Sequence, residues 1–144
     1  MSESERFEAE AKKIAEAFAS DFDAADGVLD FSRESLATLD AYLLKARKAA
    51  LPAEDLRAIA LGAGAYLAEV IRRRAPVTLR WVPASVLPGT PDPANPFLLA
   101  TPKNLVFAVL GKPQKLLEQG EEDSLVRLAG AVQDLCSREA TSAG

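Results

Sequence analysis

The fold of this chain is decided by two stretches of sequence, LDFSRESLATLD at residues 29–40 and LGAGAYLAEVI at residues 61–71. In both, apolar side chains recur every three or four residues, which is typical of a helix that buries one face. Gly62 and Gly64 lie inside the second stretch, where each costs about 1 kcal/mol of helix propensity relative to alanine. We therefore expect another backbone to approach this helix closely at the two glycines.

The segments around these stretches predict further helices from spacing and capping residues. An apolar stripe every three or four residues indicates a first helix that ends before Gly27, and a last helix with three acidic residues in its first turn. Ser32 is a predicted N-cap, and Pro52 suits the first turn of the helix after it. The expected helices cover residues 7–22, residues 32–50, residues 51–74, and residues 121–136 with Glu121, Glu122 and Asp123 in the first turn.

Between the third and last helices the apolar period changes from helical to alternating. Residues 77–82, 97–100 and 105–110 predict short strands, bounded by prolines and turn residues. The expected fold class is α+β, in which three N-terminal helices and a C-terminal helix pack around a small antiparallel sheet. We expect one domain over residues 1–140 and a flexible tail at residues 141–144.

The order of these motifs resembles small, uncharacterised bacterial domains of unknown function. The shared pattern is the Leu-Asp-aromatic-Ser element at residues 29–32, the Gly-Ala-Tyr-Leu-x-Glu-Val-Ile helix at residues 64–71, and Trp81 soon after it. The chain departs from the pattern at Ala68, where a glycine is usual, and in its long proline-rich insert. The resemblance covers roughly residues 29–130 and implies a fold but no activity.

Charge is unevenly distributed along the chain. Residues 1–40 hold eleven acidic and four basic residues, net −7, whereas residues 41–144 hold ten acidic and thirteen basic residues, net +3. An acidic surface of this kind attracts a basic partner. The dense basic cluster at residues 72–74 falls in the last turn of a helix, where the helix dipole favours cations, so we expect no nucleic-acid partner.

The composition also indicates where in the cell the chain is found. The chain has no run of about 18 apolar residues and no basic stretch leading into an apolar core, so we expect no membrane partner and a cytoplasmic location. Its one cysteine, Cys136, cannot form an internal disulfide and lies on an apolar stripe. We interpret it as a buried, inert thiol.

The sequence excludes much catalytic chemistry. It contains no histidine, which removes Ser-His-Asp and Cys-His arrangements and histidine metal sites, and no phosphate-binding or dinucleotide motif, so no cofactor is expected. Asp21, Asp23, Asp26 and Gly27 resemble part of a calcium loop. Their register fails, because Ser32 stands where the closing glutamate is needed, and we interpret them as solvated carboxylates on the interaction surface.

Glu69 interrupts an apolar stretch and is the other candidate. A half-buried carboxylate can act as an acid or base, but pairing with Arg73 four residues on, or with Arg80 on the following strand, explains it better. Tyr66 on the same helix is expected to be a core residue.

The favoured function is non-enzymatic: a domain that binds another protein, in the manner of an immunity protein, a secretion chaperone or an adaptor. The alternative is an enzyme or small-molecule binder with a carboxylate site around Glu69, Tyr66 and Asp40. A ligand-sized pocket converging on Glu69 favours the alternative, whereas an exposed apolar patch favours protein binding.

Overall fold

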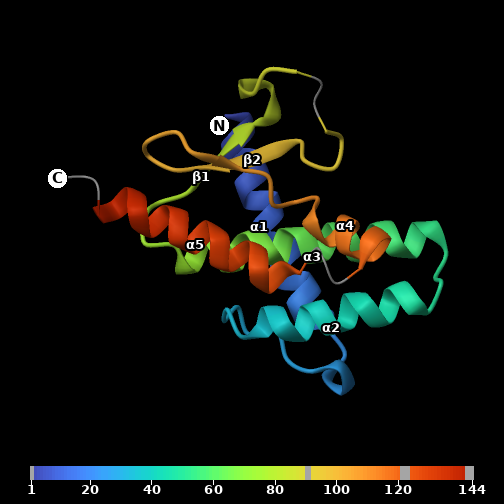
Figure 1. The fold of residues 1–144 in the computed structure, drawn as a ribbon. Helices are drawn as coiled ribbons and strands as arrows, with labels where there is room; N and C mark the ends of the chain where they lie inside the picture. The colour runs from blue at the N-terminus through green and yellow to red at the C-terminus, as the bar shows by residue number, and fades with distance from the viewer. Residues whose placement is uncertain (1, 90–91, 121–123, 142–144) are drawn as a thin grey trace.

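A computed structural model describes residues 2–89, 92–120 and 124–141, and within these ranges the chain has the predicted α+β fold. Its helices and strands follow one another in the order helix, helix, helix, three-stranded sheet, helix, helix (Figure 1). The helices are α1 (Glu3–Asp21), α2 (Ser35–Lys48), α3 (Ala53–Arg74), α4 (Lys112–Gln119) and α5 (Leu125–Thr141). The strands are β1 (Arg80–Pro83), β2 (Phe97–Ala100) and β3 (Val106–Phe107), and the 3₁₀ turns are η1 (Ala24–Asp26) and η2 (Ala84–Val86).

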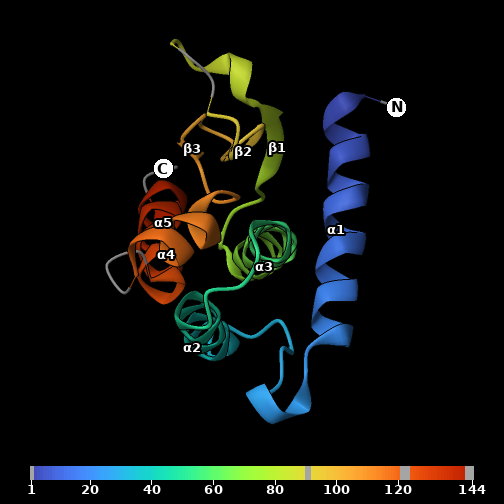
Figure 2. The ribbon, with the colours of Figure 1, turned by 90° about the vertical axis from the view of Figure 1, so that its right-hand side faces the viewer.

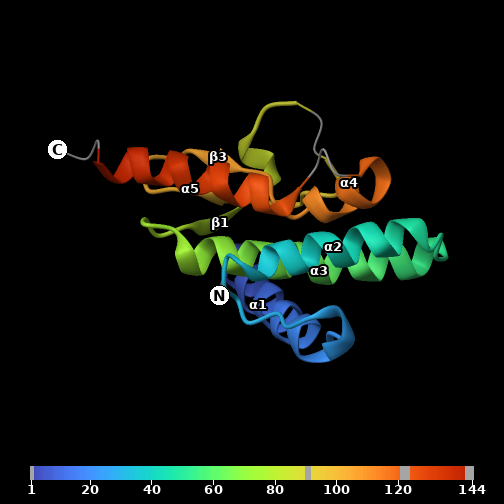
Figure 3. The same cartoon turned by 60° about the horizontal axis from the view of Figure 1, so that its bottom comes forward.

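Helix α3 is the centre of the molecule. Helix α1 crosses it on one side, and α4 and α5 lie on the other (Figure 2). Helix α2 lies alongside α3, below the layer formed by α4 and α5 (Figure 3). Every residue from Gly62 to Ile71 is buried, so the helix is covered on all sides over this stretch.

The glycines of α3 allow this covering. A Cβ atom at Gly64 would collide with the backbone carbonyl oxygen of Leu110, which confirms the expected approach of another backbone. At Gly62 the close neighbour is instead the ring of Phe18 on α1, so the prediction of a backbone neighbour is wrong there. Both glycines are therefore required by contacts that join α3 to elements on opposite sides of it.

The sheet has the order β1-β2-β3 with antiparallel pairing, and Trp81 pairs with Leu99 in its register. Strand β2 occupies the predicted residues, whereas β1 begins only at Arg80 and β3 is two residues long. Phe7 of α1 stacks on Phe97 at a ring-centroid distance of 4.0 Å and meets Trp81 edge-on at 4.9 Å. These rings fix the N-terminal half of α1 against the sheet.

The observed helices differ from the predicted ones in some of their bounds and in their number. Ser32 Oγ accepts a hydrogen bond from Ser35 N at 3.1 Å, but residues 32–36 form 3₁₀-type bonds, so α2 begins at Ser35. Helix α4 was not predicted, because its eight residues are too few to show a helical period. Thr141, expected in the tail, is the last residue of α5. The acidic first turn expected at residues 121–123 and the other tail residues, 142–144, lie outside the described residues.

Candidate functional site

Glu69 lies in a closed ionic network and is 3% exposed. Its carboxylate accepts from Arg72 Nη1 at 2.9 Å and from Arg73 Nε at 3.3 Å, and Arg72 also pairs with Glu8 of α1. The predicted pair with Arg73 is confirmed. Each carboxylate oxygen of Glu69 has an arginine partner, so this buried charge is compensated.

Other basic residues singled out from the sequence also bond within the chain. Arg80 donates to Thr101 O and to Asn104 Oδ1, each at 2.7 Å, so the alternative pairing of Glu69 with Arg80 is wrong. Arg74 donates to the carbonyl oxygen of Phe31, and the guanidinium of Arg73 lies 3.9 Å from the ring centroid of the same residue. The basic cluster thus contributes to the packing of α3.

Tyr66 and Asp40 have separate structural partners. The Tyr66 hydroxyl accepts from Phe31 N at 2.8 Å and bonds Ser35 Oγ at 2.5 Å, and burial raises the pKa of this phenol. Asp40 accepts a hydrogen bond from Ser124 Oγ at 2.7 Å and one from Leu125 N at 2.8 Å. These two bonds cap the start of α5. In the part of the chain that the structure describes, no hydrogen bond links Tyr66, Asp40 and Glu69.

Cys136 is buried on α5, and burial raises the pKa of its thiol. A protonated, enclosed thiol is a poor nucleophile. This agrees with the inert role predicted for it.

The three aspartates predicted as interaction residues do come together. They surround a hollow of about 330 Å³ between the end of α1, η1 and α2, which we call the acidic hollow. Its lining consists of three aromatic and three acidic residues: Phe18, Asp21, Phe22, Asp23, Asp26 and Tyr42. The aromatic half was not predicted as part of this surface, because it depends on how α1 and α2 meet.

The carboxylates of the acidic hollow differ in how they are engaged. Asp23 Oδ1 accepts from Ala25 N at 2.9 Å, and Asp26 pairs with Lys45 at 2.8 Å. The bond with Asp26 raises the pKa of Lys45, which holds its positive charge. Asp21 has no hydrogen bond or ion pair to any described residue. Over the same residues, no group of three acidic, cysteine or histidine side chains is arranged to hold a metal ion.

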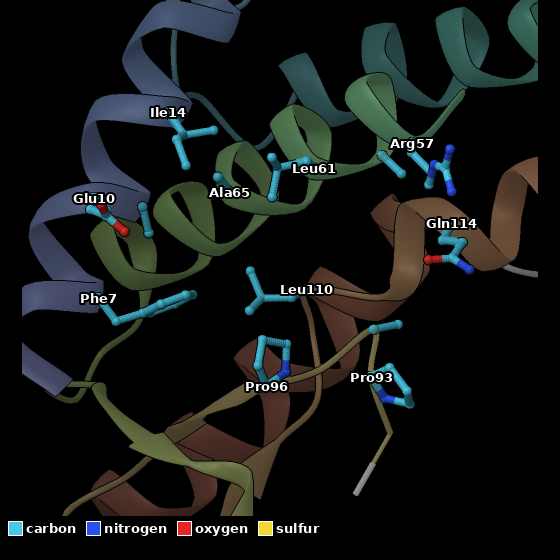
Figure 4. Close-up of a pocket in the computed structure, with 13 residues that line it drawn as sticks. Phe7, Glu10, Ile14, Arg57, Leu61, Ala65, Pro93, Pro96, Leu110 and Gln114 are labelled. Carbon is cyan, nitrogen blue, oxygen red and sulfur yellow. The ribbon is translucent and has the colours of Figure 1, made fainter. Parts of the chain in front are cut away.

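A second concave surface lies between α1, α3 and α4, and we call it the apolar slot (Figure 4). It has a volume of about 250 Å³, and one wall carries Leu61, which is 62% exposed. Glu10 on α1 and Arg57 on α3 stand at its opposite ends, with Leu61 and Ala65 between them (Figure 4). The apolar side chains that form it are Phe7, Ala11, Ile14, Ala60, Leu61, Ala65, Pro93, Ala94, Pro96 and Leu110.

The apolar slot was missed in the sequence. The signal available was Leu61, an apolar residue outside the buried stripe of α3 and four residues after Arg57. The slot needs α1 and residues 93–96 as its other walls, and these come together only in the folded chain.

No family model matches the chain, and no curated protein or solved structure matches it. The resemblance to small bacterial domains therefore stays a prediction. No helix in the described part of the chain is long and apolar enough to cross a membrane.

Proposed function

We propose that this chain is a non-enzymatic domain that binds another protein, and that the acidic hollow receives a basic side chain of that partner. The observation that carries the proposal is the composition of the hollow, three aromatic rings beside three carboxylates. An ammonium or guanidinium group is attracted both by the face of an aromatic ring and by a carboxylate. The rings of Phe22 and Tyr42 meet edge to face, at a centroid distance of 4.9 Å and an interplanar angle of 65°, and form one aromatic side of the hollow.

The charge distribution supports the same proposal. The acidic hollow lies in the part of the sequence, residues 1–40, that carries the net charge of −7. Charges on this scale raise the rate at which an oppositely charged partner arrives. An immunity protein or a secretion chaperone would use such a surface in this way.

The alternative, a small-molecule or catalytic site around Glu69, has less support. Both oxygens of Glu69 are taken by Arg72 and Arg73, and none of Glu69, Tyr66 and Asp40 lines the acidic hollow or the apolar slot. An exposed Leu61 on an apolar surface is the feature that favours a binding protein.

The test uses the partner captured from the native host. Replacing Asp21, Asp23 and Asp26 together with asparagine should slow association about tenfold at low salt and flatten its salt dependence. A matched control replaces three exposed acids outside the hollow, Glu3→Gln, Glu54→Gln and Asp134→Asn, and should retain most of the rate. Tyr42→Leu should instead speed dissociation, because it removes a ring without changing charge.

Two results would contradict the proposal. Equal slowing in the hollow and control variants would show that only net charge matters, and unaltered kinetics in both would place the interface elsewhere. If the chain turned over a metabolite and Glu69→Gln abolished this turnover, the enzyme alternative would replace the binding-protein proposal.

A further inference from the structure

We propose that the apolar slot binds a linear amphiphile with one carboxylate head group, of the chemical class of a medium-chain fatty acid, and that Arg57 binds the head group. This site is separate from the acidic hollow and from its partner. The slot is lined by α1, α3, α4 and residues 93–96 (Figure 4).

The shape of the slot suits a narrow apolar chain. Small side chains on both helices, among them Ala11, Ala60 and Ala65, leave the space open, and Phe7 and Leu110 wall its lower side (Figure 4). Its 250 Å³ lies just below the roughly 300 to 1,000 Å³ that is usual for small-molecule sites, so only a narrow ligand fits. A partner helix, about 10 to 12 Å across with its side chains, could only lie over such a slot.

The cation at one end supplies the head-group site. Arg57 is the one basic residue that lines the slot, it is exposed, and it has no ion pair or hydrogen bond to any described residue. Glu118, which lines a second hollow together with Arg57, accepts a hydrogen bond from Gln114 at 3.1 Å. A guanidinium can bind both oxygens of a carboxylate at once.

The carboxylate of Glu10, at the other end of the slot, determines which way round the ligand lies. Glu10 stands across Leu61 and Ala65 from Arg57 (Figure 4) and likewise has no ion pair with a described residue. Like charges repel, so a carboxylate head avoids Glu10 and the chain lies with its head at Arg57. The same arrangement disfavours a ligand with a cationic head at Arg57.

The test compares three probes that share a ten-carbon chain: decanoate, decanol and decyltrimethylammonium, each kept below the concentration at which it aggregates. Binding is followed by calorimetry and by the fluorescence of Trp81, the single tryptophan, whose ring lies 4.9 Å from that of Phe7. We expect decanoate to bind saturably with one molecule per chain and about tenfold tighter than decanol, which lacks the charge that Arg57 binds. Shortening decanoate to octanoate should weaken binding by up to about fourfold per methylene removed.

Two variants locate the site. Arg57→Gln should weaken decanoate about tenfold and leave decanol unchanged, whereas Arg127→Gln on α5 should change neither. Leu61→Asp should abolish binding of both probes. Leu135→Asp is its matched control, because Leu135 is also an exposed leucine on a helix but lies outside the slot.

Several results would overturn this proposal and leave the acidic hollow untouched. They are the absence of saturable binding, equal affinity for all three head groups, and loss of binding in Leu135→Asp as well as in Leu61→Asp. If no decyl probe binds and Leu61→Asp releases the captured partner, the slot belongs to a protein segment instead.

Discussion

At the scale of single residues, Gly64 and Gly130, both inside helices, differ in how closely other atoms approach them. A Cβ atom at Gly64 would meet the backbone carbonyl of Leu110, which cannot move without shifting the chain. At Gly130 on α5 the nearest atom is the end of the Arg33 side chain, 3.3 Å away, which can swing aside. The first glycine is needed for packing, and the second is not.

This contrast predicts effects of opposite sign. Gly64→Ala should lower the free energy of unfolding by about 1 to 3 kcal/mol through overpacking. Gly130→Ala should raise it by about 0.5 to 1 kcal/mol, because alanine favours the helix. Urea denaturation of the two variants measures both changes, and an unchanged midpoint for Gly64→Ala would refute the close contact with Leu110.

Tyr66 predicts a dependence of stability on pH. Burial raises the pKa of its phenol in the folded state above the ordinary value of about 10, so folding favours the protonated form. This contribution is fully present below pH 10 and is lost as the pH rises through the raised pKa. Tyr66→Phe should be less stable by about 1 kcal/mol at neutral pH, since two hydrogen bonds are lost, and should lose less stability above pH 10. Urea midpoints of both proteins at several pH values measure this, and parallel curves would contradict it.

Sequence reasoning at this scale succeeded for partners on the same helix. The pair of Glu69 with Arg73 follows from a spacing of four residues, and the buried state of Cys136 follows from its apolar stripe. The contact of Arg72 with Glu8 joins residues 64 positions apart, and no local pattern encodes it. Residues with long-range partners therefore had to be located in the folded chain.

At the scale of elements, the start of α5 depends on a residue of another helix. Asp40 of α2 accepts from Ser124 Oγ and from the backbone N of Leu125, one of the amides that the helix itself leaves unpaired. The sequence makes Asp40 a candidate site residue, and in the structure its side chain caps α5 from a neighbouring helix of the same chain.

Removing this cap should loosen α5 at its first turn. Asp40→Ala should lower the free energy of unfolding by about 1 to 2 kcal/mol, and Asp40→Asn by less, because an amide oxygen still accepts one bond. Hydrogen exchange of the Leu125 and Val126 amides should speed up in Asp40→Ala. Asp134→Ala, at an exposed position of α5, should change stability by less than about 0.5 kcal/mol. Equal effects at positions 40 and 134 would contradict the capping role.

Long elements were predicted more accurately than short ones. Helix α3, with 22 residues, was predicted closely at both ends, because Pro52 and Pro76 flank it and its apolar period is long. Helix α4 has eight residues, too few for a period to show, and was not predicted, whereas β3 lies within the strand predicted at residues 105–110 but has only two residues. Both form because longer elements pack against them.

At the scale of the whole molecule, both concave surfaces depend on where α1 lies. Helix α1 crosses α3 (Figure 2), its last turns reach the acidic hollow, and its first turns line the apolar slot. The net charge of residues 1–40 can be counted from the sequence, and so the acidic surface was predicted. The aromatic lining and the slot were not, because the crossing of α1 over α3 is fixed by the ring of Phe18 against Gly62.

The attachment of α1 predicts that helices and sheet unfold together. Phe7 stacks on Phe97 and meets Trp81, so it joins α1 to β1 and β2. Truncating a fully buried phenylalanine to alanine costs about 3 to 5 kcal/mol, and for the half-buried Phe7 we expect roughly 2 to 3 kcal/mol. Circular dichroism reports the helices, and the fluorescence of Trp81 reports the sheet. In Phe7→Ala both signals should move to the same lower urea midpoint, because the loss destabilises one cooperative unit. Two separate midpoints would show that the sheet unfolds independently of the helices, and that α1 is attached through α3 alone.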